Sequence, residues 1–586
     1  YLYEQIHYEG FGRQTISGRA TFSRLRTSVP GNDNIATGGG NSFASFLLGE
    51  IFSSQTENRR IVRQQWRSHS MYFQDDWKVT PRLTLNLGLR YEFTLPPLEA
   101  DDKWSDFTPD KPNPRANGIP GALRFAGFGT GREDSRTLIP GWYGGFGPRL
   151  SAAYSFDDKT VIRAGIARTF GVVKTVTGST HFQGAITIDA RNSLDLGLTQ
   201  YALLDTGIPA PPIPPSIDPS FANGGNPAWW QGSEAVRLPE NYDWTLSVQR
   251  ELGRGFVVET AYNATIGAHL TAGVLRYNQL DPAYLQQYGR ALLLANINSP
   301  EAVAAGIQKP YPTFTGNVAQ ALRPFPQYND IDTASGVGDK SGHSSYHAGL
   351  AKLSKRFSDG VTLESSYLFS KLITDSDTYG GGAALDHYNR RLEKAVSTLD
   401  QTHLLKVNYI LELPFGKGKR WLKEGVGSAI LGGWRFAGVH LYGSGTPLQF
   451  SCGAAIPIFN GRCAPTITTY DGWVADNDGA DWQGASRYFV APRTFSAVTP
   501  NDRLGNASRT NPKVRTPPQY NENFSLAKTI SFGETRRLDL RAEAFNAFNR
   551  VRFNPGTTNI DDANFGRVTS TLNEPRRMQF AAKFYF

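Results

Sequence analysis

Few residues of this chain stand at a spacing that would support catalysis. The nine His residues show no H-E-x-x-H spacing, and we find neither a G-x-S-x-G elbow nor a phosphate-binding loop. A Ser/His/acid set is a spatial arrangement that spacing does not reveal, so a hydrolase is kept as an alternative. Basic residues are dispersed and no nucleic-acid-binding module occurs. We therefore expect no enzyme activity, no cofactor and no nucleic-acid partner.

Two short groups of residues have side chains that could bind a metal ion or form a disulfide. Residues 476–481 have the oxygen density of a calcium loop but lack the Glu that completes an EF-hand, so no metal site is predicted. Cys452 and Cys463 lie in one long predicted loop and could close a small disulfide in an oxidising exterior. Two unpaired thiols are the alternative.

Aromatic residues in long non-repetitive segments are the candidate ligand contacts. Trp229, Trp230, Phe325 and Tyr328 are the predicted ligand-binding residues, and the Pro-rich stretch 209–219 could offer a further stacking surface. Trp and Tyr anchor ligands at low entropic cost, which suits sugars or peptides. A packed core within the loops is the alternative reading of the same residues.

The elements that must position these segments are strands with strict two-residue periodicity. In residues 83–93, Leu83, Leu85, Leu87 and Leu89 alternate with polar or small residues, so we expect these leucines on one face and Asn86 and Arg90 on the other. Similar alternation recurs at 150–156, 244–248, 256–262, 361–369, 405–411, 434–442, 524–526, 538–544 and 577–586. About nine to eleven residues are enough for a tilted strand to cross a bilayer. A half-buried strand of a soluble sandwich is the alternative for any single segment.

Composition agrees with membrane-spanning strands. The chain has 586 residues, 39% hydrophobic content and a mean hydropathy of −0.39, and it contains no apolar run long enough for a transmembrane helix. Barrel strands distribute their apolar content by alternation, which keeps mean hydropathy low. No second compositional regime marks a domain boundary. The net charge of +9 is spread along the chain and is compatible with anionic lipopolysaccharide as a neighbour.

The lengths of the connections between the predicted strands indicate the topology. Short links at 79–81, 157–159, 251–255, 358–360 and 532–536, with a longer one at 414–433, alternate with long segments at 94–147, 171–241, 268–342, 372–402, 443–521 and 549–575. Short periplasmic turns and long extracellular loops are typical of outer-membrane barrels. We expect 171–241, 268–342 and 443–521 to gather outside the cell and capture ligand.

The N-terminal part is less regular. Strands are expected at 2–8, 16–23, 53–65 and 71–78, and residues 41–49 suggest a short helix or an ordered link. The fold predicted is therefore an all-β, large transmembrane antiparallel β-barrel of about sixteen strands. The chain opens on Tyr1 without an initiator Met, which indicates a processed or truncated portion.

Several motifs resemble those of TonB-dependent receptors, closest to the Oar-like group. They are the YFQDDWKVTPRLTLNLGLRYE stretch of 72–92, RAEAFNAFN of 541–549, NQLDP of 278–282, VAQALRPFPQY of 318–328 and SGTP of 444–447. The resemblance implies a barrel of about 22 strands, closed by an N-terminal plug and energised by TonB. Residues 1–586 would then be the barrel domain, without the plug or any carboxypeptidase-regulatory-like domain. The resemblance also implies that Phe580, Phe584 and Phe586 form a C-terminal signal for the outer-membrane assembly machinery.

Polar positions on the predicted inner face could contact a plug or a ligand. They are Arg90, Glu92, Arg163, Asp539, Arg541 and Glu543. A hydrated wall whose side chains satisfy one another is the alternative. Three functions remain open: a TonB-dependent receptor importing a large or scarce substrate, with peptide or oligosaccharide as the guess; a surface binding or adhesion barrel without import; and an outer-membrane hydrolase.

Overall fold

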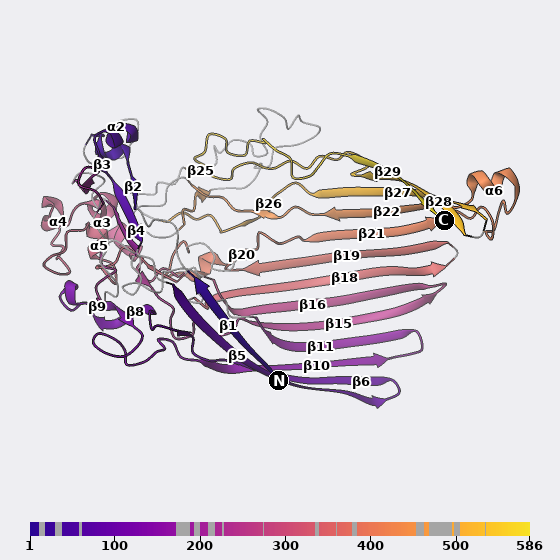
Figure 1. Ribbon diagram of the computed structural model, residues 1–586, viewed down its shortest axis with the longest axis horizontal. Coiled ribbons are helices and arrows are strands. Elements are labelled where there is room, and N and C mark those ends of the chain that lie inside the picture. The colour runs from indigo at the N-terminus through magenta and orange to yellow at the C-terminus, as the bar shows by residue number, and fades with distance from the viewer. Residues whose placement is uncertain are drawn as a thin grey trace.

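The computed structural model describes residues 1–10, 18–29, 38–57, 61–171, 188–192, 200–208, 217–224, 228–272, 275–333, 339–358, 360–377, 384–452, 462–467, 495–496, 504–533 and 535–586. These residues are dominated by one large antiparallel sheet, drawn from indigo to yellow in Figure 1. Fourteen strands follow one another in its main order: β1 (Leu2–Gly10), β5 (Val62–Thr80), β6 (Leu83–Thr94), β10 (Trp142–Ser155), β11 (Thr160–Phe170), β15 (Glu240–Gly253), β16 (Phe256–Leu270), β18 (Gly342–Ser358), β19 (Val361–Thr374), β21 (His403–Glu412), β22 (Trp434–Gly443), β27 (Gln519–Phe532), β28 (Arg536–Phe545) and β29 (Arg577–Tyr585).

The register of strand pairing keeps the apolar residues of all strands on one face of the sheet. Leu87 pairs with Leu150, and Asn86 pairs with Ser151, so apolar and polar residues stay on separate faces from strand to strand. The apolar face is exposed rather than covered by other elements: its exposed members include Leu87, Leu89, Leu150, Ile166, Leu246, Tyr262, Phe369, Leu526, Leu540 and Phe580. A soluble sandwich would bury such a face against a second sheet, so this arrangement is that of a membrane wall.

Aromatic residues border the apolar face at both ends of the strands. At one end the rings of Tyr91 and Phe146 stack at 4.4 Å, and those of His69 and Phe93 at 4.7 Å. At the other end, Phe156, Phe357 and Phe532 are exposed at or beside the short links, together with the aliphatic Val79 and Leu252. Two such belts are typical of strands that cross a bilayer.

Short and long links occupy opposite ends of the sheet, as the sequence predicts. In Figure 1 the short turns, including the one at 157–159, lie at the right, and the described parts of 171–241, 268–342 and 443–521 lie at the left. The left end also holds most of the remaining elements. We call the described residues beyond the strand ends on this side the loop layer.

The loop layer and the N-terminal part contain short strands and helices. The strands are β2 (Arg19–Thr21), β3 (Glu50–Ile51), β4 (Ser53–Glu57), β7 (Leu98–Glu99), β8 (Ser105–Pro112), β9 (Pro120–Phe125), β12 (Ile188–Asn192), β13 (Ala202–Leu203), β14 (Ala228–Trp229), β17 (Ile331–Asp332), β20 (Ala395–Val396), β23 (Pro447–Leu448), β24 (Thr466–Ile467), β25 (Phe495–Ser496) and β26 (Asn511–Arg515). The helices are η1 (Arg24–Arg26), α2 (Ser42–Leu47), η2 (Pro114–Ala116), α3 (Ala283–Leu294), α4 (Pro300–Ala304), α5 (Val318–Ala321) and η4 (Arg390–Glu393), with α6 (Gly425–Leu431) at the opposite end.

Over the part of the chain that the structure describes, the large sheet has sixteen strands, but two of its members differ from those expected. The short strands β7 and β20 complete the sixteen by pairing with β5 and β19. The expected strand at 53–65 is divided between β4 and β5, and β5 continues without a break through 71–78. Together β2, β4 and β12 form a separate three-stranded sheet, so the strand expected at 16–23 does not join the wall over its described residues. The helix α2 confirms the short helix suggested at 41–49.

Among the described residues, no helix is both long enough and apolar enough to cross a membrane.

Candidate functional site: the polar wall and the loop layer

The six polar wall residues predicted from sequence share the face opposite the exposed leucines. Arg541 pairs in register with Ala527, and Arg163 with Ala153, on the same side of the sheet as Asn86. Most of them contact a neighbour along the strand: Arg90 with Glu92, Arg541 with Glu543 at 3.5 Å, and Asp539 with Arg537 at 3.6 Å. The Arg163 guanidinium donates to Gln249 Oε1 at 2.8 Å. These contacts are what a hydrated wall requires, and contact with a plug or ligand stays a prediction.

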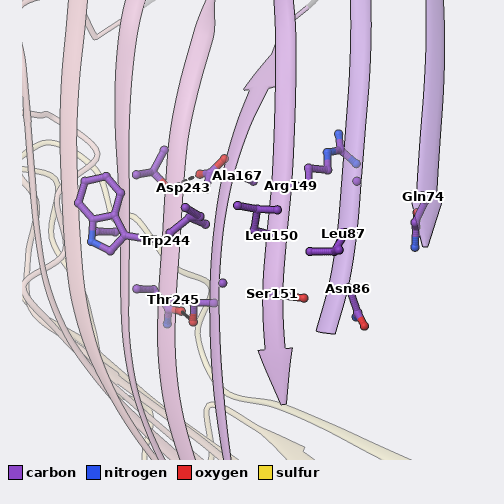
Figure 2. Close-up of a pocket in the computed structure, with 16 residues that line it drawn as sticks. Gln74, Asn86, Leu87, Arg149, Leu150, Ser151, Ala167, Asp243, Trp244 and Thr245 are labelled. Carbon is purple, nitrogen blue, oxygen red and sulfur yellow. Dashed lines mark hydrogen bonds between the residues drawn. The ribbon is translucent and has the colours of Figure 1, made fainter. Parts of the chain in front are cut away.

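A hollow of about 510 Å³ lies against β5, β6, β10, β11, β15 and β16. Figure 2 shows Asn86, Arg149, Ser151 and Thr245 among the side chains that line it. Gly88 and Gly165 line it and have no side chain that would project into it. Amide, hydroxyl and guanidinium groups there can form hydrogen bonds with a polar solute that passes along the wall.

The loop layer has hydrophobic cores of its own. One core surrounds the hairpin of β8 and β9 and contains Phe107, Leu123, Phe125, Ala222, Ala228, Tyr328 and Ile331. A second holds α3, α4 and α5 together through Leu280, Leu285, Leu293, Ile297 and Phe314. Segments far apart in sequence are therefore ordered by mutual burial.

The four predicted ligand-binding aromatics are buried to different extents in and near the first core. Tyr328 is fully buried, and its hydroxyl donates to Gly121 O at 3.2 Å. Phe325 packs edge-on against Phe107 at 5.1 Å and is partly buried. Trp229 and Trp230 are half-buried in and after β14, and Trp230 also packs on this core. Tyr328 is thus a core residue without surface for a ligand, whereas the other three retain exposed area.

The backbone conformation of Gly121 determines where the Phe325 ring can pack. Gly121 has φ +105, and a Cβ there would lie 2.6 Å from Phe325 Cδ1. Glycine is required at this position for both reasons. Gly121 O also accepts from Gln327 Nε2 at 2.9 Å, so the hairpin and the 325–328 segment are joined at one residue.

The two loop motifs quoted above contact each other directly. The Asn278 side chain accepts from Phe325 N at 2.9 Å and donates to Phe325 O at 3.0 Å. The next residue, Gln279, donates to Asp386 Oδ1 at 2.9 Å and accepts from His387 N at 2.7 Å. Buried amides that bond to backbone order both partners because an unsatisfied group would be costly. The NQLDP motif therefore holds the 325–328 segment and the segment around Asp386 in place.

Sequence reasoning missed an aromatic chain that these bonds assemble. The ring centroids of Trp230 and Tyr277 lie 4.0 Å apart, those of Tyr277 and His387 5.3 Å, and those of His387 and Tyr388 5.5 Å. Tyr388 is exposed at the end of the chain. No local pattern indicates this grouping, since its members come from three separate segments. The sequence signal that could have indicated it is that Tyr277 directly precedes the NQLDP motif.

Burial keeps this aromatic chain uncharged. Desolvation raises the pKa of the Tyr277 and Tyr388 hydroxyls and lowers the pKa of the His387 imidazole. His387 Nδ1 is buried and has no hydrogen-bond partner among the described residues. The exposed part of the chain thus offers neutral rings, which suits stacking on a sugar or peptide.

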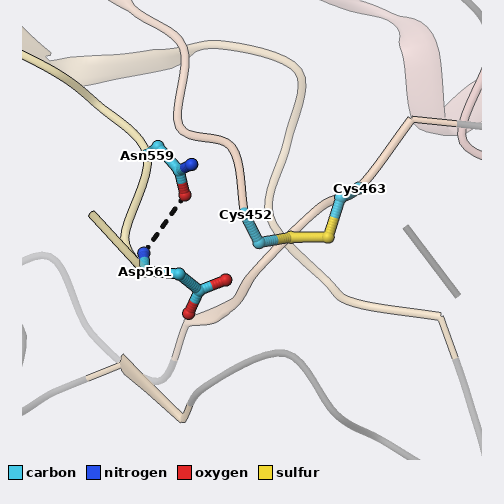
Figure 3. The surroundings of a disulfide bond; sticks show 4 residues. All are labelled: Cys452, Cys463, Asn559 and Asp561. Carbon is cyan, nitrogen blue, oxygen red and sulfur yellow. Dashed lines mark hydrogen bonds between the residues drawn. A yellow bond between two sulfur atoms is a disulfide. The ribbon is translucent and has the colours of Figure 1, made fainter. Parts of the chain in front are cut away.

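Cys452 and Cys463 are joined by a disulfide in the structure, as Figure 3 shows. Cys452 lies in a third core, with Phe450, Ile560, Phe565 and Val568 among its members. The Ile560 N–H donates to Ser451 O at 2.9 Å, so the chain next to Cys452 is held against the segment between β28 and β29.

The proposed assembly-signal residues all project from the apolar face of β29 or beyond its end. Phe580 pairs with Ala542 and Phe584 with Leu538, and both side chains are exposed, as is Phe586. Their recognition by the assembly machinery stays a prediction.

Within the described residues, no group of three or more His, Cys, Asp or Glu side chains is arranged to hold a metal ion. Residues 476–481, the segment weighed as a calcium loop, lie outside them.

Comparisons with solved structures give weak overall likeness. The pyoverdine receptor FpvA of Pseudomonas aeruginosa is 12% identical, with a TM-score of 0.38, over 90% of this chain and 43% of its own. For the outer membrane transporter YddB of Escherichia coli the identity is 10%, the TM-score 0.38 and the shares 90% and 55%. For the ferric yersiniabactin uptake receptor FyuA of Yersinia pestis they are 9%, 0.37, 92% and 47%. The chain thus spans about half the length of these proteins.

No curated protein matches the sequence. The model of one protein family, described as an outer membrane beta barrel domain, matches residues 1–579. That match covers nearly the whole chain and agrees with the exposed apolar face, the two aromatic belts and the separation of short from long links. The chain belongs to the family of outer membrane β-barrel domains.

Proposed function

We propose that this protein is the barrel of an outer-membrane receptor that captures its ligand on the loop layer and imports it with a plug domain and TonB. The observation that supports this proposal is that the loop layer is ordered. Buried amides and hydrophobic cores hold loops from four long segments against one another. A binding surface that is ordered before the ligand arrives loses less entropy on binding.

The capture surface we propose is the aromatic chain Trp230, Tyr277, His387 and Tyr388. Its neutral rings favour a peptide or an oligosaccharide, because both present apolar faces that stack on aromatics together with groups that form hydrogen bonds. The half-buried Trp229 and Phe325 extend the same region along β14 and the 325–328 segment.

The import step rests on the resemblance to TonB-dependent receptors. In that proposal the plug contacts the polar wall, and the hollow beside Asn86 and Arg149 lies on the route of the ligand. The competing function is a barrel that binds its ligand at the surface without import. Import energised by TonB requires the proton gradient of the cell, whereas surface binding does not.

Ligand binding is tested on whole cells that produce the full-length protein. Fluorescent oligosaccharides and peptides serve as probes, with ferric chelates as comparison ligands. Replacing Tyr277 and Tyr388 by Ala should reduce retention of the bound probe at least tenfold, since stacking on one aromatic contributes on the order of 1 kcal/mol or more. Leu294→Ala, an exposed change on α3, is the matched control.

A protonophore then separates import from binding. Under our proposal it abolishes accumulation of the probe inside the cell and leaves surface retention unchanged. Accumulation that survives the protonophore would contradict import energised by TonB, whereas retention without any accumulation would favour the surface-binding alternative.

A further inference from the structure

The link between β21 and β22 differs from the other links at the short-link end of the sheet. Where its neighbours are tight turns, this one runs from 413 to 433 and contains α6. Figure 1 shows α6 beyond the strand ends at the right. The link carries the basic residues Lys417, Lys419, Arg420 and Lys423 against one acidic residue, Glu424.

The C-terminal end of α6 is fastened to the apolar face of the wall. Trp434 and Lys528 pair in register on that face. Lys528 Nζ donates to Ala429 O at 2.8 Å and to Ile430 O at 2.7 Å, and Trp434 Nε1 donates to Ile430 O at 2.9 Å. Carbonyls at a helix C-terminus need such partners. The helix is therefore attached on the side of the wall that faces lipid, not on the polar side.

The side chains that α6 presents are apolar and uncovered. Val426 is 75% exposed and Ile430 58%, and the two stand one turn apart on the helix. Trp421, Leu422 and Leu431 are exposed beside them. Phe532 of the neighbouring strand β27 is exposed on the lipid-facing side at this end, so the apolar surface of the link continues the lipid-facing surface of the wall.

Basic side chains border this apolar surface. Lys419 is paired with Glu412 at 2.6 Å, whereas Lys417, Arg420 and Lys423 are exposed. Apolar residues beside Lys and Arg on a short helix are the composition of elements that lie in a membrane interface and bind anionic headgroups.

We propose that the 413–433 link is an interfacial anchor that binds anionic phospholipids of the periplasmic leaflet. Val426 and Ile430 enter the acyl region beside the wall, and Lys417, Arg420 and Lys423 bind phospholipid phosphates. This site is separate from ligand capture at the opposite end, and it holds whether or not the protein imports a ligand.

The test uses the full chain folded into vesicles of phosphatidylcholine alone or of equal parts phosphatidylcholine and phosphatidylglycerol. Both native cysteines form the disulfide, so a single Val426→Cys variant can be labelled with an environment-sensitive fluorophore under non-reducing conditions. Brominated lipids report contact by quenching. We expect a blue-shifted label, quenched by either lipid, with about a fivefold preference for brominated phosphatidylglycerol. A label at Asp158→Cys, in the tight turn at 157–159, is the position control and should remain water-exposed.

Charge is tested by Lys417→Gln, Arg420→Gln and Lys423→Gln together. The preference for phosphatidylglycerol should fall to near one, while Lys309→Gln, Arg391→Gln and Lys394→Gln at the opposite end should leave it intact. Heat-modifiable migration checks that every variant is folded. A water-exposed label in both vesicles would overturn the proposal and leave a periplasmic protein as the occupant. A lipid-buried label without headgroup preference, or a preference that survives the triple change, would overturn the anionic phospholipid as ligand.

Discussion

The wall and the loop layer place apolar side chains in opposite environments. Leu246 and Phe580 in the wall are 51% and 73% exposed, whereas Leu280 and Tyr328 in the loop layer are fully buried. Lipid covers the first pair, and protein must cover the second. The wall is consequently held by backbone pairing between neighbouring strands, and the loop layer by side-chain packing, buried amides and a disulfide. We expect the two regions to respond separately to substitution.

The largest effect should follow removal of a loop-layer core residue. Tyr328→Ala leaves a cavity between the β8–β9 hairpin and the 325–328 segment and removes a hydroxyl bond to Gly121, and loss of such a side chain costs about 3–5 kcal/mol. Hydrogen exchange should increase throughout this core while heat-modifiable migration of the barrel is unchanged. Tyr388→Ala, at an exposed position, is the control. Unfolding of the wall in Tyr328→Ala would show that the two regions are one cooperative unit.

A charge on the lipid-facing side should affect the wall alone. Leu87→Arg is expected to destabilise the folded barrel by about 2–4 kcal/mol if the residue lies near the membrane midplane. Denaturant unfolding in lipid vesicles measures this free energy. Asn86→Arg places the same charge on the polar face one residue away and should be tolerated. Equal destabilisation by the two changes would contradict the assignment of faces.

Loss of the disulfide should loosen one loop core. Cys452→Ser with Cys463→Ser removes a cross-link that spans a sequence separation of 11, and closing a loop of this size contributes about 3 kcal/mol in the chain-entropy model. Hydrogen exchange should rise around Phe450 and Phe565, which share a core with Cys452. The β8–β9 hairpin should show no change, and a change there would mean that the loop cores are coupled.

The smallest effect concerns pH. Asp106 in β8 is fully buried beside Arg124, and burial raises the pKa of its carboxyl from 3.8 to about 6. Above pH 3.8 the opened hairpin loses a proton that the closed one keeps, so stability falls as pH rises through this interval and stays low above pH 6. Between about pH 4.5 and about pH 7 the closed hairpin should lose about 2 kcal/mol, seen as faster hydrogen exchange after correction for intrinsic rates. Asp106→Asn should abolish the pH dependence, and a wall strand should show none.

The wall could be predicted closely because its pattern is local. Residues 83–93 alternate without interruption, so their sequence alone predicts opposite faces for Leu87 and Asn86, and the strand pairing confirms this. Short links join neighbouring strands at one end, and this fixes their antiparallel pairing. The prediction of two separate strands in place of the long strand β5 was wrong. Residues 62–70 of this strand lie at the loop layer, where Val62 and Trp66 are buried in a core. Their hydrophobic pattern therefore does not follow exposure to lipid.

The loop layer could not be predicted in the same way, because it has no period. The sequence identified Trp230, Phe325 and Tyr328 as residues that need apolar surroundings, yet their depths depend on Gly121 and Asn278, at least 47 positions away from Phe325 in the chain. Tyr277 and His387 meet only because Gln279 bonds to the segment around Asp386.

The sequence by itself therefore determined which residues face lipid and which end of the sheet carries the long loops, since two-residue periodicity and link length are properties of neighbouring residues. Only the tertiary structure decided which loop aromatics are buried, which are exposed, and on which side of the wall α6 is fastened. Those outcomes depend on hydrogen bonds between distant segments, such as Lys528 to Ala429, and such bonds leave no pattern in the sequence.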